Sequence, residues 1–501
     1  MFHRSLPCLI LLAMALAAGA KPAAPQPRTG ADAALIAAIT AQTTDFTTPE
    51  PFEDRPGGAA TARSGLPDQA FSQPLATIGF ETEPMFRQGK AVFNKIWVAA
   101  PAKTTGSDGL GPLFVARSCQ ACHIRDGRSP PPGEGIGAAA MVVFLSLPDL
   151  AGGTDLPGVA PTRPDPVYGS QLQPFATSGQ PAEFQLGLRY ENSRVTLAGG
   201  QQVALRRPVY SVEHPGYGPL GAGAMLSPRV APPMIGLGLL AAIPDQDILA
   251  HADPLDRNGD GVSGRPNWAG APGAQQLGRF GHKAAVPDLL AQTALAFSGD
   301  MGLSTPLRPA VWGDCTAAQV ACRAAPDGSG PQSTDGSTGA SEVSATTFAQ
   351  VAFYAQSLGP PARPAPGNAD VLRGKALFYA AGCSACHVPK YVTARLPDEP
   401  DRSFQLIWPY SDLLLHDMGA GLADNRPEGR ATGTEWRTAP LWGLGHTLQV
   451  SGQQTYLHDG RARSVLEAIL WHGGEAAMTR SRITQMPAPD RADLLRFLAS
   501  L

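Results

Sequence analysis

The pattern of hydrophobic and polar positions predicts helices separated by long segments without regular periodicity. Residues 347–358 carry apolar side chains at helical spacing, and a second helix is expected from Val465 to His472. The run Met141-Val-Val-Phe-Leu is typical of a short buried strand instead. Glycine (56) and proline (49) make up about a fifth of the 501 residues, more than an ordinary helical protein carries. We therefore predict a mainly α fold with long ordered loops and a few short strands.

The N-terminal segment, residues 1–20, has the features of a secretory signal peptide. Arg4 precedes a short apolar run, and Ala18-Gly-Ala20 fits the small-x-small cleavage pattern. The alternative, a membrane anchor, needs a longer apolar run, and no later stretch reaches 18 apolar residues. We expect cleavage near Ala20, a periplasmic location and no transmembrane segment.

The remaining chain is predicted to form an arm and two domains. Residues 21–75 show little periodicity and are rich in Ala, Pro, Thr and Gly, which favours an extended arm. The sequence Gly-Lys-Ala-x-Phe occurs at Gly89 and again at Gly374, which indicates two related units. The proline-rich stretch 359–367 marks a boundary between domains at 76–365 and 366–501. The first domain is the one enlarged by insertions.

Charge and cysteine content narrow the possible functions. A formal net charge of −3 without long basic runs argues against a nucleic-acid binder. Of the seven cysteines, Cys8 lies in the signal segment. Cys315 and Cys322 are expected to form a small disulfide loop in an exported protein, with two free thiols as the alternative.

The other four cysteines form two CxxCH motifs, each downstream of a Gly-Lys-Ala-x-Phe sequence. This spacing places two thiols one turn apart for thioether bonds to haem vinyl groups and puts the following imidazole under the iron. Zinc binding is the alternative for one isolated motif, but it does not explain two such motifs behind a signal peptide. We predict two covalently bound haems c, attached and ligated at Cys119, Cys122 and His123, and at Cys383, Cys386 and His387.

The C-terminal region carries a family resemblance. Residues 456–461 predict a turn around His458, and residues 436–445 and His472-Gly-Gly-Glu-Ala complete the pattern. The chain resembles the di-haem cytochrome c peroxidase superfamily, and is most similar to its branch of di-haem oxidoreductases, over residues 76–501. The resemblance implies two cytochrome c-like haem domains and an axial ligand fourteen residues after His458, which here is His472 rather than methionine. The alternative for His472 is a helix-end histidine bonded to backbone, while His416 and His458 are interpreted as structural histidines.

A similar segment in the first domain carries the predicted catalytic residues. If His282 corresponds to His458, Ala296 stands where the second unit has His472, so the first haem lacks that ligand and is open to a small oxidant. The resemblance implies a catalytic glutamine at the position of Gln292 and an acid/base carboxylate near Asp300. The alternative interpretation of Asp300 is a residue of a helix end or turn without a catalytic role. His282 falls at the position of a bridging tryptophan. If His282 or Met141 were the sixth ligand of the first haem iron, that iron would have no open coordination position for an oxidant.

The acidic stretch Asp256-Arg-Asn258-Gly-Asp260-Gly alternates oxygen donors as in the first half of a calcium loop. It lacks the glutamate expected at position twelve, so a solvated turn is the alternative. Calcium remains an expected second cofactor.

The leading hypothesis is a periplasmic peroxidase in which the second haem passes electrons to the first. Expected partners are a small redox protein or a quinone-linked electron source, and a small oxidant such as hydrogen peroxide. The alternatives are an electron-transfer or haem-handling protein with both irons six-coordinate, and an oxygenase on the same frame.

Overall fold

The computed structural model describes residues 24–63, 65–137, 141–149, 159–271, 273–329 and 341–501. The predicted signal peptide lies outside the described residues. The α-helices are α2 (Gly30–Thr40), α3 (Glu83–Asn94), α4 (Cys119–Cys122), α5 (Leu237–Ala241), α6 (Asp245–Leu249), α7 (Leu289–Leu295), α8 (Val320–Arg323), α9 (Ala345–Ser357), α10 (Ala369–Ala381), α11 (Thr447–Ser451), α12 (Val465–Trp471), α13 (Ala477–Gln485) and α14 (Ala488–Ala499). Within the described ranges, none of these helices has the length and apolar character needed to cross a bilayer.

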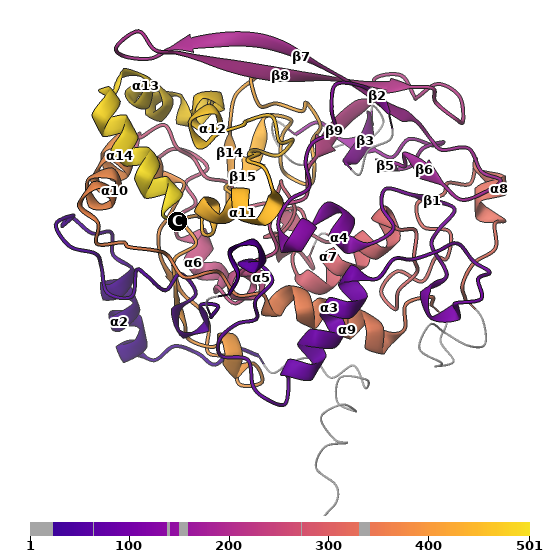
Figure 1. The fold of residues 1–501 in the computed structure, drawn as a ribbon, viewed down its shortest axis with the longest axis horizontal. Coiled ribbons are helices and arrows are strands. Elements are labelled where there is room, and N and C mark those ends of the chain that lie inside the picture. Colours follow the sequence, from indigo (N-terminus) through magenta and orange to yellow (C-terminus); the bar gives the residue numbers. More distant parts are fainter. Residues whose placement is uncertain (1–23, 64, 138–140, 150–158, 272, 330–340) are drawn as a thin grey trace, which may run out of the picture.

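The strands are short except for one hairpin and are joined in several small antiparallel sheets (Figure 1). They are β1 (Leu113–Phe114), β2 (Gly135–Gly137), β3 (Val142–Pro148), β4 (Thr162–Arg163), β5 (Gln171–Leu172), β6 (Phe175–Ala176), β7 (Gln185–Thr196), β8 (Gln202–Glu213), β9 (Met225–Arg229), β10 (Trp268–Ala269), β11 (Gln276–Leu277), β12 (Tyr391–Val392), β13 (Leu406–Ile407), β14 (Leu415–Asp417) and β15 (Glu435–Arg437).

Two crossed helix pairs repeat along the chain. Helix α3 packs on α9, and α10 packs on α14 (Figure 1). In the first pair a Cβ added to Gly89 would lie 2.7 Å from the Cβ of Tyr354, and in the second a Cβ added to Gly374 would lie 2.7 Å from that of Phe497. The glycine of each Gly-Lys-Ala-x-Phe motif is therefore the point where two helix backbones touch, which explains why the motif recurs.

The phenylalanine of each motif reaches the following histidine of CxxCH. The ring centroids of Phe93 and His123 are 6.1 Å apart, and those of Phe378 and His387 are 6.4 Å apart. Each phenylalanine also packs at 5.2 Å against the aromatic residue of the partner helix, Tyr354 in the first unit and Phe497 in the second. The repeat is thus a helix pair with an aromatic contact that supports the imidazole of the CxxCH motif.

The prediction of a mainly α fold is wrong. Helices account for 30% and strands for 17% of the chain, and many strands lie in the insertion between α4 and α5. Within it β3 pairs with β4, β5 and β9, and its alternate residues Val143 and Leu145 are buried against Phe184. Because these contacts join segments tens of residues apart, helical periodicity gave no indication of them.

The long β7–β8 hairpin extends from the first unit across the second (Figure 1). Leu197 and Leu205 near its turn pack against Leu470 of α12. The guanidinium of Arg463, just before α12, donates to the carbonyl oxygen of Ala204 at 2.9 Å. The hairpin therefore holds the helix that ends at His472.

The segment predicted to form an extended arm contains helix α2 and a buried glutamate, Glu53, that contacts two basic residues. Thr29 and Asp32 form a reciprocal capping box at the start of α2. Further on, Glu53 is buried and accepts hydrogen bonds from Arg363 and from Lys375, the latter at 2.8 Å. Lys375 is the lysine of the second Gly-Lys-Ala-x-Phe motif, so this segment neutralises a buried charge of the second unit.

Candidate functional site

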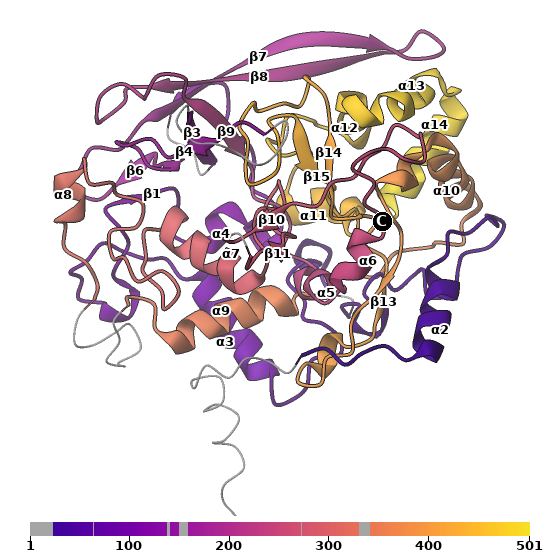
Figure 2. The ribbon, with the colours of Figure 1, turned by 180° about the vertical axis from the view of Figure 1, so that it is seen from behind.

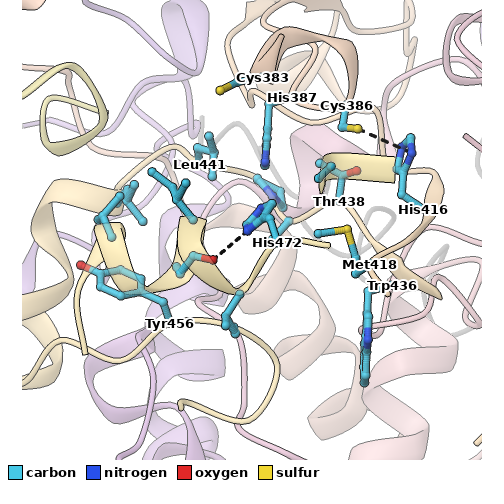
Figure 3. Close-up of a pocket in the computed structure, with 18 of the residues that line it drawn as sticks. Cys383, Cys386, His387, His416, Met418, Trp436, Thr438, Leu441, Tyr456 and His472 are labelled. Carbon is cyan, nitrogen blue, oxygen red and sulfur yellow. Dashed lines mark hydrogen bonds between the residues drawn. The ribbon is translucent and has the colours of Figure 1, made fainter. Parts of the chain in front are cut away.

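The second CxxCH motif borders a cavity of about 300 Å³. Cys383 and Cys386 follow directly on helix α10, because Gly382 ends that helix in a left-handed conformation (φ 92°). The cavity is walled by the motif, by the chain around β15 and by α12 (Figure 3). The four cysteines of the two motifs are not disulfide-bonded, so their sulfur atoms remain available for thioether bonds.

His387 and His472 face each other across this cavity (Figure 3). The Nδ1 of His387 donates to the carbonyl oxygen of Tyr410 at 2.9 Å, and the Nδ1 of His472 donates to that of Ala468 at 2.7 Å. Burial lowers the pKa of His387 to about 4 and also lowers the pKa of His472, so both imidazoles are neutral at pH 7. Each ring presents its Nε2 lone pair, the form in which histidine binds a metal.

His416 lies beside the sulfur of Cys386 rather than across the cavity. Its Nδ1 is 3.5 Å from the Sγ of Cys386 and 2.7 Å from the carboxylate of Glu475, and its Nε2 is 2.7 Å from that of Asp412. Although burial opposes it, Asp412 raises the pKa of His416 well above its usual value. His416 is therefore an imidazolium between two carboxylates at the edge of the site, which excludes it as an iron ligand.

His458 stacks on Trp436 in the same cavity, with ring centroids 3.7 Å apart and planes inclined by 11°. Lys283 and Arg229 lie over the same indole, 4.6 and 5.4 Å from its centroid. His282 also lines the cavity, and burial with the nearby cation Arg229 lowers its pKa well below the usual value. The structure thus places His282 with the second CxxCH motif, in the cavity that contains the Trp436–His458 stack.

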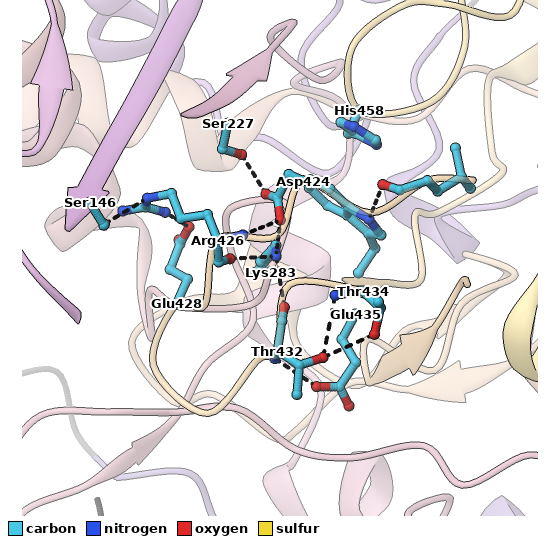
Figure 4. Close-up of polar contacts among 12 residues, drawn as sticks. Ser146, Ser227, Lys283, Asp424, Arg426, Glu428, Thr432, Thr434, Glu435 and His458 are labelled. Atoms are coloured by element: carbon cyan, nitrogen blue, oxygen red, sulfur yellow. Dashed lines mark hydrogen bonds and ion pairs between the residues drawn. The ribbon is translucent and has the colours of Figure 1, made fainter. Parts of the chain in front are cut away.

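A buried polar network fixes the loop that precedes Trp436 (Figure 4). The ammonium of Lys283 donates to the carboxylate of Asp424 at 2.7 Å and to the carbonyl oxygens of Arg426 and Thr432 at 2.8 Å each. Asp424 also accepts from Ser227 on β9 at 2.6 Å. These bonds tie the loop to the β insertion and hold the indole in position.

The first CxxCH motif repeats the proximal arrangement. Helix α4 contains both cysteines, and the Nδ1 of His123 donates to the carbonyl oxygen of Pro232 at 2.9 Å. Burial lowers the pKa of His123 to about 4, so its Nε2 also presents a lone pair. The carbonyl oxygen of Pro232 therefore matches that of Tyr410 in the second unit, although no sequence feature relates the two positions.

Asp300 lies next to this first motif. Burial raises its pKa to about 6, against the opposing effect of a 2.9 Å hydrogen bond from the amide Nε2 of Gln171. After burial, the carboxylate of Asp300 is the largest cause of the raised pKa of Cys122, and it also raises that of Cys119. A carboxyl group that titrates near neutral pH beside the first site is suited to proton transfer.

Gln292 lies on α7, two turns before Asp300, and its Oε1 is buried without a hydrogen-bond partner among the described residues. Between the two residues the helix widens into a π-helical turn, Ala296–Asp300. The amides of Gln171 and Gln173 both donate to the carbonyl oxygen of Gly299 in this turn, at 3.1 and 2.9 Å. A π-helical turn is frequent at functional sites because it redirects side chains.

Helices α7 and α12 occupy corresponding places in the two units. Each has seven residues and a side-chain N-cap, Asp288 in the first and Ser464 in the second, and each cap accepts from the amide three residues on. The residue that follows the helix is Ala296 in the first unit and His472 in the second. The capping at the start of the two helices therefore agrees with the pairing, but their ends differ, because Ala296 stays helical and continues into the π-helical turn whereas His472 is a non-helical cap.

The remaining candidates lie away from both motifs. Met141 is buried in the core of the β insertion with Val143. Asp256 is half-buried, Asn258 and Asp260 are exposed, and all three accept hydrogen bonds from amides of their own loop. No cluster of three His, Cys, Asp or Glu residues suited to a metal occurs within the described ranges. Cys315 and Cys322 form a disulfide with Cα atoms 6.0 Å apart.

Sequence reasoning missed residues that reach the two sites from distant segments. Gln171 lies 129 positions before Asp300, and Arg128 follows the first motif yet lines the cavity of the second. Arg437 follows Trp436, which begins one of the segments that carry the family resemblance, but the resemblance assigned Arg437 no role. A search for polar residues flanking the motifs would have found Arg128 and Arg437, whereas nothing in the sequence distinguishes Gln171.

The family comparison agrees with this arrangement. A family model described as "Di-haem oxidoreductase, putative peroxidase" matches residues 52–146 and 168–501. No curated protein matches the chain at a significant level.

Proposed function

Because the chain belongs to the di-haem oxidoreductase family, we propose that it is a c-type di-haem peroxidase that reduces hydrogen peroxide at the first CxxCH unit. Electrons enter at the second unit, from a small redox protein or a quinone-linked source. The observation that carries the proposal is the difference between Ala296 and His472, the residues that follow α7 and α12, two helices of equal length with the same N-terminal capping. In the second unit His472 lies across the cavity from His387, and the sequence pairing assigns Ala296, which cannot ligate iron, to the corresponding place in the first unit.

The chain's own residues fit two haems. Each CxxCH histidine is neutral and held through Nδ1 by a backbone carbonyl, so its Nε2 would be the atom that holds a haem iron. His472 has the same orientation from the opposite wall of the second cavity. A bound haem supplies one-electron chemistry and, where a coordination position is open, a place for a small oxidant.

In the first unit Asp300 and Gln292 perform the proton chemistry. With a pKa of about 6, Asp300 accepts the proton of bound peroxide and returns it to the departing oxygen. Gln171 orients the carboxyl through Oδ1, and the unpartnered Oε1 of Gln292 accepts a hydrogen bond from peroxide or water. The overall reaction converts hydrogen peroxide, two protons and two electrons into two water molecules.

We also propose that the protein is exported to the periplasm. The N-terminal sequence pattern supports this, and so does the disulfide between Cys315 and Cys322, because disulfides persist in oxidising compartments. Mass determination of the protein recovered from the periplasmic fraction tests it. A mature chain beginning near Lys21 is expected, and a cytoplasmic, full-length chain would contradict it.

Substitutions at Ala296 and His472 test the proposed function. In the holoprotein, we expect one low-spin and one high-spin haem by electron paramagnetic resonance. Replacing Ala296→His should make the first haem low-spin and abolish its spectral response to peroxide. Replacing His472→Ala should make the second haem high-spin.

A matched control is Leu290→His, which adds a histidine on the exposed side of α7. It should leave both spectra and the peroxide response unchanged. Two low-spin haems in the wild-type protein, with no response to peroxide in the half-reduced form, would contradict the peroxidase proposal and favour an electron-transfer protein.

A further inference from the structure

Three arginines line the second cavity, Arg128, Arg437 and Arg480, and the first two are buried without an acidic partner among the described residues. The Nε of Arg437 donates to the carbonyl oxygen of Gly281 at 2.9 Å, and its Nη1 donates to that of Thr438 at 3.0 Å. The Nη2 of Arg128 donates to the carbonyl oxygen of Leu457, and its Nε is buried with no hydrogen-bond partner. Among the described residues, these contacts give both guanidinium groups neutral oxygens only.

The electrostatics of the two side chains show the cost of this arrangement. Burial lowers the pKa of Arg128 and that of Arg437 to about 10 each. The acids nearest to them are already engaged: Asp459 pairs with Arg461 at 2.7 Å, and Asp412 with His416 at 2.7 Å. A buried cation without a counterion is expensive, so these arginines need an anion inside the cavity.

The cavity's one acidic wall residue does not supply that anion. Glu475 accepts from the hydroxyl of Ser263 at 2.7 Å and is paired with His416 at 2.7 Å. The rest of the wall is mostly apolar, and its charged groups are Arg128, Arg437, Arg480 and the imidazolium of His416, beside the neutral imidazoles of His387 and His472. The space between His387 and His472 is therefore built for a flat apolar group with carboxylates at one edge.

We propose that Arg128 and Arg437 bind the propionate carboxylates of the haem attached at Cys383 and Cys386. This inference rests on the proposed haem attachment. Planar guanidinium groups match carboxylates in shape and charge, and the propionates leave the porphyrin on the side away from the vinyl groups that bind cysteine. The pairing neutralises both arginines and satisfies the Nε of Arg128.

The origin of Arg128 gives the contact a further consequence. It lies five residues after His123, and the amide of the next residue, Ser129, donates to the carbonyl oxygen of Cys122 at 2.9 Å. The attachment loop of the first haem therefore contributes an anion-binding group to the second.

Reduction potentials test the proposal on the holoprotein, using the low-spin haem as reporter. A nearby cation disfavours the ferric state, so Arg437→Leu and Arg128→Leu should each lower the midpoint potential of that haem. We expect at least a tenfold change in the one-electron equilibrium constant, which is 59 mV. Arg437→Lys keeps the charge and should restore most of the shift. Arg207→Leu, on the exposed β8, is the matched control and should not shift it.

Unchanged potentials in both leucine variants, with the fold intact by circular dichroism, would overturn the proposal. A wild-type potential that moves with added acetate, and loses this response in the leucine variants, would also overturn it, because the arginines would then bind a diffusible carboxylate. The readout does not require peroxide turnover. Failure of the haem attachment itself would appear separately, as fewer than two haems per chain in the pyridine haemochrome spectrum.

Discussion

Replacing Asp300→Asn should stabilise the protein while it removes activity. The carboxyl of Asp300 has one side-chain hydrogen bond, from Gln171, and burial raises its pKa from 3.8 to about 6. A folded-state pKa above the unfolded value means that the folded state binds this proton more tightly. Stability is therefore lost as the pH rises through about 6, and asparagine, which cannot ionise, does not lose it.

The magnitude follows from the shift. About two pKa units at about 1.36 kcal/mol each give up to about 3 kcal/mol of additional stability for the asparagine variant at pH 8, and almost none at pH 4. Peroxide turnover should fall by about 10² to 10⁴, the usual contribution of a positioned acid/base group.

Urea unfolding followed by circular dichroism at pH 4 and pH 8, together with peroxide turnover, measures both effects. Asp314→Asn is the matched control, because burial raises the pKa of Asp314 to about 6 as well, but its carboxylate accepts from the amides of Ser170 and Gln171 instead. The control variant should gain stability at high pH and keep its turnover. An Asp300→Asn variant with normal turnover, or with the same stability difference at both pH values, would refute the reasoning.

Three other substitutions test the framework. Gly374→Ala places a Cβ against the carbonyl oxygen of Asp493, so the helices must separate and thermal or urea unfolding should show a loss of about 1–3 kcal/mol; an unchanged midpoint would contradict the close crossing. Replacing Cys315→Ser together with Cys322→Ser removes the disulfide and opens a short loop. Urea unfolding should show a loss of about 2.5 kcal/mol of stability, the entropy cost of closing a loop of this length. If the wild-type protein is equally stable with and without reductant, the disulfide does not stabilise the fold. His472→Met should keep the second haem low-spin but raise its midpoint potential in a redox titration, because thioether stabilises the ferric state less than imidazole; a high-spin product would show that position 472 does not reach the iron.

The features that the sequence predicted correctly are those that neighbouring residues encode. The helix predicted over residues 347–358 depends on apolar residues three or four positions apart, and the structure has it as α9, Ala345–Ser357. The helix predicted from Val465 ends at Trp471, so His472 falls at its C-terminal cap. The family relationship was also predicted, because it rests on short motifs with fixed spacing. The family model, which matches most of the chain, confirms it.

The β insertion and the chemical surroundings of the sites were decided by tertiary structure alone. The pairing of β3 with β9 joins residues about eighty positions apart, and such contacts leave only a weak alternation of apolar residues in the sequence. Gln171 reaches Asp300 because β5 runs beside the π-helical turn, and Arg128 enters the second cavity because the two units pack together. The sequence determined which cysteines and histidines form the two CxxCH motifs and where helices form. Burial raises the pKa of Asp300 and leaves Arg128 and Arg437 without an acidic partner, and it exists only once distant segments pack.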